Sequence, residues 1–336
     1  MKKRYWLNLI VIILLIAFSF YRYKQRIYTV KNSQIMMDTQ IDISISSKNK
    51  SVNRIVDKSF NIVRIFDDKF SYYNENSDLN KINASTSDSI NIDRDFYDIF
   101  KIAEDIYQQS NGLYDVSIGN LIELWDFNEG DIPSKEKLDS IIGNDTFELI
   151  QFDSKILKKP KNMKINLGSI SKGFIIDKAM SFVVKQGVEE AFINAGGDLK
   201  VYRKDEKPIK IGIQHPRIPN KIIATLKVSN KAVVTSGDYE RYFEKDGKRY
   251  HHIINPKTGF PAQNTISVTV ISESATLADA LSTALFVMNP IDGIDLIKQY
   301  PETEAIIYYQ SGDGLISLKS EGMKEYIVSE LNIDTK

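Results

Sequence analysis

The sequence predicts an α+β fold in which one large domain follows a single apolar N-terminal segment. Three observations lead to this prediction. Some segments carry apolar residues at helical spacing, others alternate or run apolar over the short lengths typical of strands, and the two kinds are mixed without a regular strand–helix–strand repeat. A chain of 336 residues can bury a sizeable core, and residues 27–336 contain no low-complexity tract.

The first 26 residues differ in charge from the rest of the chain. They hold six basic residues and no acidic one, so the overall balance of 44 Lys+Arg against 44 Asp+Glu conceals a basic start and an acidic body. An uncharged run of 17 residues lies between Arg4 and Arg22, with Tyr5, Trp6 and Tyr21 at its ends. Roughly 17–25 residues cross a bilayer, and aromatic residues favour its two surfaces.

We interpret residues 1–26 as a membrane anchor, with a cleaved signal sequence and a buried helix as alternatives. The basic start and apolar stretch fit a signal sequence, but Ala17-Phe18-Ser19-Phe20 is a poor cleavage site. Basic residues flank both sides of the run, so charge gives no clean orientation. We expect residues 2–4 in the cytoplasm and residues 27–336 outside it, because no second span follows.

The body then alternates between predicted helices and strands. An alternating strand covers 41–46, and helices with one apolar side cover 52–70 and 96–106. A polar loop is expected over 128–137 and a third helix over 175–184. The later elements are strands at 191–194, 209–214, 222–228, 232–235 and 266–271, helices at 275–288 and 291–299, and strands near 305–309 and 315–318.

Composition excludes several classes of protein. The chain has no cysteine, so it has no disulfide framework, iron–sulfur cluster or thiolate zinc site, and only three histidines are present. A net charge of zero argues against a nucleic-acid-binding protein, which normally has a basic excess.

Asp279 is the most unusual residue of the body, because it is the only charge in a predicted helix of otherwise apolar or neutral residues. A lone carboxylate there is costly unless it is paired or binds a cation. Thr283 lies four residues later on the same helical face, and two hard oxygen ligands one turn apart suit Mg²⁺ or Ca²⁺. The alternative is a carboxylate bonded to nearby backbone donors.

Other polar segments have both a chemical and a purely structural interpretation. Residues 167–173 place small residues before a helix whose N–H groups could meet an anion, or they form an ordinary helix entry. Residues 194–198 form either a ligand-binding loop or a tight strand-to-strand turn. His251 and His252 lie beside a Pro–Gly turn, where one could serve as acid or base near neutral pH. Ordinary turns or packing are the alternatives for 235–238, for 112–115 with 124–125, and for 70–73, whose tyrosines could stack on a flat ring.

In this order, these segments resemble the ApbE family, the FAD:protein FMN transferases. The resemblance runs from about Met36 to about Met288. Its most specific pieces are Lys172-Gly173 followed by Asp177, Asn194 with Gly196-Gly197-Asp198, Thr235-Ser236-Gly237-Asp238, His252-Ile253-Ile254-Asn255-Pro256 with Thr258-Gly259, and Ala278-Asp279-Ala280 with Thr283.

The resemblance implies a single α+β domain over 27–336, with mainly antiparallel strands, that binds FAD and Mg²⁺. It implies transfer of the FMN half of FAD to a Ser or Thr hydroxyl of an acceptor protein, through a phosphodiester, with release of AMP. The implied metal ligands are Asp279, Thr283 and the backbone carbonyl of Ser169. The implied FAD contacts are Met37, Ser71, Tyr72, Tyr73, Asp115, Lys172, Asn194, Gly196, Gly197, Asp198, Thr235, Ser236, His252, Ile253 and Ile254.

The resemblance also suggests partners and a location. Acceptors would be membrane redox-pump subunits or extracytoplasmic electron-transfer proteins that carry a Ser/Thr flavinylation motif. The body would face the periplasmic side of a bacterial inner membrane. Many members are lipoproteins, and since this chain lacks the required cysteine, the apolar run would be its tether.

Two positions depart from the family pattern. Asp38 stands where the family has glycine. Its side chain opposes a close approach of the backbone to the nucleotide, although Asp tolerates turn geometry. Asn166 stands where an acid is common, so a possible metal ligand is lost.

The chemistry required is a phosphoryl-type transfer, in which positioning and charge neutralisation do most of the work. His252 is our candidate base and Asp279 our second catalytic residue, with Asp238 and Asp279 as alternative bases and His215 as a structural residue. Two alternative functions would use the same site. One is an FAD pyrophosphatase, in which water replaces the acceptor hydroxyl and FMN and AMP are released. The other is a non-catalytic FAD-binding protein.

Overall fold

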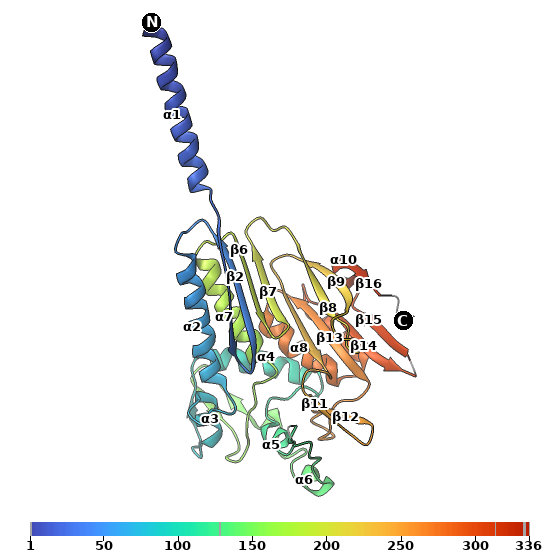
Figure 1. Cartoon of the computed structure of the whole chain (residues 1–336). Coiled ribbons are helices and arrows are strands. Elements are labelled where there is room, and N and C mark those ends of the chain that lie inside the picture. The colour runs from blue at the N-terminus through green and yellow to red at the C-terminus, as the bar shows by residue number, and fades with distance from the viewer. Residues whose placement is uncertain (1, 128, 313, 332–333, 336) are drawn as a thin grey trace.

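A single N-terminal helix stands apart from a body of mixed helices and strands (Figure 1). The structure is a computed structural model that describes residues 2–127, 129–312, 314–331 and 334–335. Helix α1 (Lys2–Lys24) exposes nearly all of its large apolar side chains, and its segment Arg4–Tyr23 is long and apolar enough to cross a membrane.

The body is built on one mainly antiparallel sheet, as predicted. Its nine strands lie in the order β1-β2-β6-β7-β10-β13-β14-β15-β17, and only the last pair is parallel. The strands are β1 (Tyr28–Met36), β2 (Thr39–Ser47), β6 (Glu190–Ala195), β7 (Asp198–Arg203), β10 (Ala232–Gly237), β13 (Thr265–Ser272), β14 (Glu304–Ser311), β15 (Gly314–Lys319) and β17 (Asp334–Thr335).

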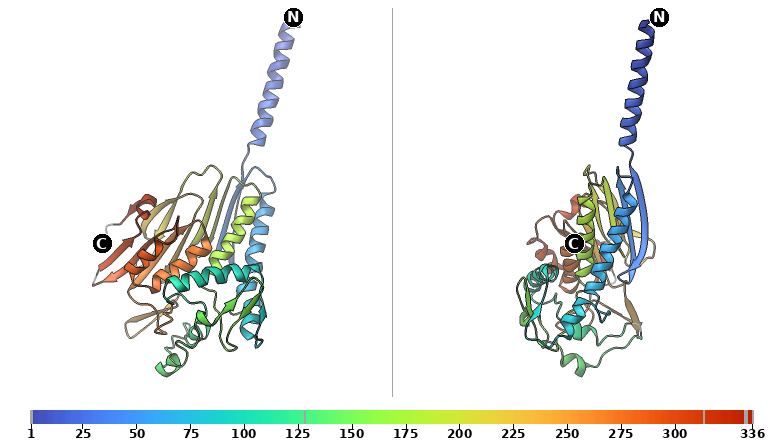
Figure 2. Two further views of the ribbon diagram at one scale, coloured as in Figure 1. Left: turned by 180° about the vertical axis from the view of Figure 1, so that it is seen from behind. Right: turned by 90° about the vertical axis from the view of Figure 1, so that its left-hand side faces the viewer.

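Helices cover one face of this sheet, as the two views of Figure 2 show. The predicted apolar side of α2, which includes Ile55, Phe60 and Val63, is buried there. Alternate strand residues complete this main core, because successive side chains of a strand point to opposite faces. The covering helices are α2 (Val52–Phe70), α7 (Ser171–Lys185), α8 (Ala275–Val287) and α9 (Pro290–Ile297), while α3 (Asp78–Ala84) packs against α2 and α4 (Arg94–Gln109) packs against α8.

A smaller sheet covers the opposite face, so every residue of β13 is buried. This sheet has the order β16-β9-β8, and a second core that includes Val233, Leu226 and Tyr308 lies between the two sheets. Its elements are β8 (Ile209–Gln214), β9 (Ile222–Val228), α10 (Met323–Tyr326) and β16 (Ile327–Glu330).

Short elements close one end of the body. The β11–β12 hairpin packs on a third apolar cluster around Trp125, which also includes Leu121, Leu138 and Ile254. These elements are β3 (Ile90–Asn91), α5 (Gly119–Ile122), α6 (Lys135–Asp139), the 3-10 helix η1 (Phe147–Leu149), β4 (Gln151–Phe152), β5 (Ile156–Lys158), β11 (Tyr242–Lys245) and β12 (Lys248–His251).

The structure corrects the expected loop over 128–137. Residue 128 lies outside the described residues, but 135–137 belong to α6 rather than to a loop. The Ser134 side chain accepts a hydrogen bond from the N–H of Lys137, which is the N-cap that starts this helix. The predicted helix over 175–184 also begins earlier, at Ser171, so the Lys172-Gly173 pair lies in its first turn.

Candidate active site

All eighteen residues proposed from the sequence line one cavity of about 1130 Å³. The cavity lies at the end of the main sheet that is reached by the β1–β2 turn, the β6–β7 turn and the end of β10. Ligand clefts are usually about 300–1,000 Å³, so this one can hold a molecule larger than most cofactor fragments. Its residues are Met37, Ser71, Tyr72, Tyr73, Asp115, Ser169, Lys172, Asn194, Gly196, Gly197, Asp198, Thr235, Ser236, His252, Ile253, Ile254, Asp279 and Thr283.

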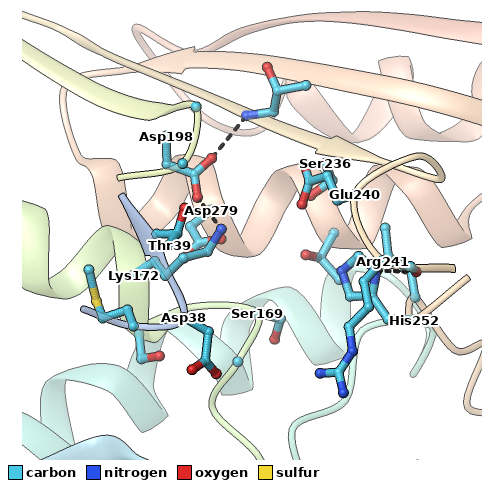
Figure 3. A pocket seen from close by; sticks show the side chains of 18 of the residues that line it. Asp38, Thr39, Ser169, Lys172, Asp198, Ser236, Glu240, Arg241, His252 and Asp279 are labelled. Carbon is cyan, nitrogen blue, oxygen red and sulfur yellow. Dashed lines mark hydrogen bonds and ion pairs between the residues drawn. The ribbon is translucent and has the colours of Figure 1, made fainter. Parts of the chain in front are cut away.

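The main sheet opens between β7 and β10 beside this cavity. These two strands share only two residue pairs, after which the side chain of Asp198 takes the place of a strand partner. Its Oδ1 accepts a hydrogen bond from the Thr235 N–H at 3.2 Å, while its Oδ2 lies 2.6 Å from the Lys172 Nζ (Figure 3). Burial alone would lower the pKa of Lys172, but the attraction of Asp198 and Asp279 raises it above its ordinary value.

Helices α7 and α8 touch at Gly173. A Cβ built there would lie 2.2 Å from the carbonyl oxygen of Ala275 and 2.8 Å from the Cβ of Asp279, so only glycine permits this approach. The Gly173 N–H donates to Asp279 Oδ2 at 2.9 Å. The carboxylate of Asp279 therefore supplies part of the negative charge expected at the N-terminus of α7.

Asp279 is buried yet incompletely satisfied. Among the described residues, Gly173 is its only protein hydrogen-bond donor, and burial together with repulsion from Asp198 raises its pKa to about 7. Asp279, Thr283 and Ser169 all line the cavity and offer only hard oxygen donors. This set fits Mg²⁺, which is usually held by one or two carboxylates and completed by substrate phosphates and water. In the described part of the chain, no cluster of three or more His, Cys, Asp or Glu forms an all-protein metal cage.

Asp177 fixes the start of α8. It accepts hydrogen bonds from the N–H groups of Ala275 and Thr276 at 3.0 and 2.9 Å and forms an ion pair with Lys200 at 2.7 Å. Burial would raise the pKa of Asp177, but Lys200 and the donors of α8 hold it below its ordinary value. The segment from Lys172 to Asp177 thus joins α7 to the helix that carries Asp279.

Two tight turns form another wall of the cavity. Met37 and Asp38 have φ of 53° and 55° between the paired residues Met36 and Thr39, which is the geometry of a type I′ hairpin. Asp38 therefore adopts the turn that the family fills with glycine. Gly196 has φ of 62°, and a Cβ there would lie 2.4 Å from Thr39 Oγ1. The strand-to-strand interpretation of residues 194–198 is correct, and these residues also face the cavity.

Several proposed ligand contacts use their polar atoms within the fold. Asn194 Oδ1 accepts from the Gly197 N–H at 3.0 Å, so this side chain shapes the glycine turn. Ser236 Oγ lies 2.7 Å from Ser282 Oγ, and Thr235 Oγ1 lies 2.8 Å from Thr269 Oγ1. These residues therefore line the cavity with their apolar surface and backbone as well as with hydroxyl groups that are already hydrogen-bonded inside the fold.

The tyrosine end of the cavity is open to solvent. Tyr73 is 68 % exposed and meets Tyr72 edge-on, with ring centroids 5.6 Å apart. Ser71 ends α2 through a bond from its N–H to the carbonyl of Asp67. Asp115 accepts from the N–H and hydroxyl of Ser117 at 2.7 and 2.6 Å, while burial raises its pKa to about 6.

The two adjacent histidines have different environments. His251 is buried, with Nε2 2.8 Å from the Ala262 carbonyl and Nδ1 accepting from the Ile253 N–H. His252 faces the cavity, and its Nδ1 lies 3.3 Å from the Arg241 carbonyl. A carbonyl only accepts, so Nδ1 carries the proton and Nε2 is left as an acceptor. Burial lowers the pKa of His252 to about 4, which keeps the ring neutral at pH 7.

The other candidate bases are held elsewhere. Asp238 forms two 2.6 Å hydrogen bonds with Arg217 and is absent from the described cavity lining. His215 Nδ1 accepts from the N–H groups of Arg217 and Ile218, as expected for a structural residue. Asn166 Oδ1 accepts from the Gly168 N–H at 2.8 Å, so the residue that replaces the family's acid organises the loop before α7.

Sequence reasoning missed Glu240 and Arg241, which lie opposite Lys172 across the cavity (Figure 3). The Glu240 side chain is open to the cavity, and desolvation together with Asp198 and Asp279 raises its pKa to about 7 against the opposing effect of Lys172. A signal was present in the sequence, because both residues lie within three positions of Asp238, the last residue of the Thr235–Asp238 motif. Only the turn after β10 brings them to the cavity.

Comparison with known proteins gives one consistent result. The model of the ApbE family matches residues 37–307. The chain is 28% identical over 301 residues to the FAD:protein FMN transferase of Klebsiella pneumoniae, covering 87% of this chain and 92% of that protein. It is 35% identical over 231 residues to the enzyme of the same name from Buchnera aphidicola, covering 65% and 68%.

Solved structures agree with these relatives. The ApbE protein of Thermotoga maritima superposes with a TM-score of 0.81 at 31% identity, covering 90% of this chain and 100% of that one. The flavin transferase ApbE of Vibrio cholerae has a TM-score of 0.80 at 25% identity, with the same coverage.

Proposed function

The chain belongs to the ApbE family and transfers FMN from FAD to an acceptor protein, and we propose that Asp279, Thr283 and the Ser169 carbonyl hold a Mg²⁺ ion for this reaction. The observation that carries the proposal is the buried Asp279 carboxylate. It faces the cavity with one oxygen not bonded to any described protein donor, while Ser169 and Thr283 offer further oxygen ligands in the same lining and the charge of Lys172 lies nearby. A buried carboxylate in this state is stabilised by a cation.

We propose that FAD lies along the cavity, with its flavin toward Tyr72 and Tyr73 and its pyrophosphate near Lys172 and Asp279. The remaining proposed contacts surround this path. They are Met37, Ser71, Asp115, Asn194, Gly196, Gly197, Asp198, Thr235, Ser236, His252, Ile253 and Ile254.

In the proposed reaction, a Ser or Thr hydroxyl of the acceptor attacks the phosphorus on the flavin side of the pyrophosphate. A bond forms between the acceptor oxygen and that phosphorus, the bond to the AMP oxygen breaks, and the hydroxyl proton passes to Nε2 of His252. Bound Mg²⁺ would neutralise charge on the phosphates. Lys172, held in its charged form by Asp198, adds a fixed positive charge beside the same path.

A labelling assay tests the metal site. The full chain is incubated with FAD, Mg²⁺ and a candidate acceptor, and fluorescence that survives denaturing electrophoresis reports covalent FMN. Asp279→Asn and Thr283→Val should lower the rate by at least about 100-fold, whereas Thr225→Val, on β9 outside the cavity lining, should not. Metal-dependent labelling that is unchanged in Asp279→Asn would refute the assignment.

The same assay separates the pyrophosphatase alternative. FMN and AMP released without any acceptor, at the rate seen with acceptor, would favour hydrolysis. Release that requires the acceptor and matches its labelling one to one would favour transfer.

We further propose that α1 anchors the chain in a bacterial inner membrane with the body on the periplasmic side. The apolar exposed face of α1 supports this proposal. The acceptors would then be redox-pump subunits or extracytoplasmic electron-transfer proteins with a Ser/Thr flavinylation motif. Recovery of the full chain in washed membranes, with Met1 retained, would support the anchor, and a shortened soluble chain would indicate a cleaved signal.

A further inference from the structure

Helix α1 joins one end of the main sheet (Figure 1), and the β1–β2 turn at the other end carries Met37, which lines the cavity. Helix α1 ends at Lys24, and only residues 25–27 separate it from β1, which begins at Tyr28. Strand β1 then runs in a single direction to Met36, and the next residue, Met37, lines the cavity. The first strand of the body therefore leads directly from the anchor to the reaction site.

The length of β1 sets the separation. Its nine residues pair with β2 in continuous register, and at about 3.3 Å per residue they span roughly 30 Å. Because the paired strands are rigid, this separation does not depend on loop motion. Strands β6 and β10 also reach the cavity with the ends that lie away from the anchor.

The anchor also contacts the body directly. The Lys50 Nζ lies 4.6 Å from the centre of the Tyr23 ring, which places the β2–α2 loop beside the end of α1. Arg26 lies over the ring of Tyr28 at 5.3 Å. These contacts add to the short covalent connection and favour one orientation of the body relative to the helix.

The end of the body nearest the anchor carries positive charge. Lys48 and Lys50 are exposed in the β2–α2 loop, Lys48 also pairs with Glu189 at 3.8 Å, and Arg22 and Arg26 flank the exit of α1. Basic residues next to a membrane are attracted by the negative charge of anionic lipids. The described charges at this exit therefore match an anionic lipid surface.

We propose that the body stands upright on the membrane, with the β2–α2 loop against the lipid surface and the cavity held about 30 Å above it. This inference rests on the proposed anchor. It assigns a partner class: the acceptor presents its hydroxyl on an extramembrane part that reaches this height.

The absence of cysteine from the chain makes the posture measurable. The full chain is reconstituted in vesicles that contain phosphatidylglycerol, with a fluorophore on Asn49→Cys or on Ser311→Cys, and energy transfer to a labelled headgroup is recorded. Both sites are exposed and outside the cavity lining, at the near and far ends of the sheet. We expect strong transfer from position 49 and weak transfer from position 311. Equal transfer from both would overturn the proposal, and failure to float with the vesicles would instead refute the anchor.

A second experiment tests the partner class. A soluble acceptor domain that the detergent-solubilised enzyme labels is attached to vesicle lipid through helical spacers of 7 or 20 residues, about 10 or 30 Å. We expect at least tenfold faster labelling with the long spacer in vesicles, and equal rates in detergent. Equal rates in vesicles would refute the upright posture, whereas no labelling in detergent would count against the transfer assignment.

A charge reversal provides the matched control for this experiment. The double variant Lys48→Glu, Lys50→Glu should weaken the contact of the β2–α2 loop with the lipid surface. The rate advantage of the long spacer should then decrease, while labelling in detergent stays at the parent rate. The same change at the exposed Lys135 and Lys137, near the far end of the body, should leave the spacer preference unaltered.

Discussion

Gly173→Ala tests whether the contact between α7 and α8 positions the metal site. The added Cβ would lie 2.2 Å from the Ala275 carbonyl oxygen, whereas ordinary contacts begin near 3.4 Å, so the helices must separate by about 1 Å. Overpacking of this kind costs about 1–3 kcal/mol, which lowers the Tm of a body of this size by roughly 2–5 °C. Displacement of a reacting group by 1 Å can cost about 100-fold in rate, and we expect a loss of that size in Mg²⁺-dependent labelling.

Thermal unfolding and single-turnover labelling measure these two effects separately. Gly293→Ala is the control, because this glycine lies in α9 against the same helix α8, but its Cβ would meet flexible side-chain ends, Leu285 Cδ2 at 2.8 Å and Ile307 Cδ1 at 3.4 Å. We expect Gly293→Ala to keep the parent rate and a Tm within a few degrees of the parent. A Gly173→Ala variant with parental Tm and parental rate would refute the close helix contact. Equal losses in both variants would show that α8 responds to any added packing.

Three further outcomes follow from the site. Asp177→Ala should lower the free energy of unfolding by about 3 kcal/mol, because the Lys200 ammonium loses its carboxylate partner and keeps only the Glu273 carbonyl. The pKa of Asp177 is depressed in the folded state, so its contribution to stability is present above pH 4 and is lost on acidification. Urea unfolding should therefore show a smaller difference in free energy of unfolding between Asp177→Ala and the parent at pH 3 than at pH 7. Because burial lowers the pKa of His252 to about 4, the acid limb of kcat should lie near pH 4 rather than 6.5, and His252→Ala should lower kcat by about 100-fold with little change in KM; a raised KM with normal kcat would make it a binding residue only. Tyr73→Ala should raise the Kd of FAD by about 2- to 12-fold in a fluorescence titration, with no change in Tm since its ring is 68 % exposed; unchanged affinity would place the flavin elsewhere.

Helix and strand types were predictable where burial follows a simple period. The side of α2 with Ile55 and Phe60 and the apolar run of β13 were expected, because each residue's neighbours along the chain report its environment. The short β11–β12 hairpin and the two-residue strands β3 and β4 were missed, because so few residues carry no clear period. Helix α6 was missed because its start depends on the single cap at Ser134.

The candidate site was predictable as a set of residues but not as an arrangement. The proposed residues all line one cavity, yet their motifs did not reveal which polar atoms are already bonded inside the fold. Asn194 and Ser236 use theirs on Gly197 and Ser282, and such pairings are invisible in a sequence because they join separate elements. Glu240 was overlooked for the same reason, since its approach to Lys172 depends on the turn after β10.

The sequence by itself determined the class of fold, the apolar N-terminal run and the identity of the motifs, because these features depend on composition and on spacing along a single segment. The tertiary structure alone decided that Gly173 meets Asp279 across 106 residues of chain, that the sheet opens at Asp198, and that the anchor and the cavity lie at opposite ends of β1. Each of these depends on contacts between distant segments, and such contacts arise only when the whole sheet and its helices pack together.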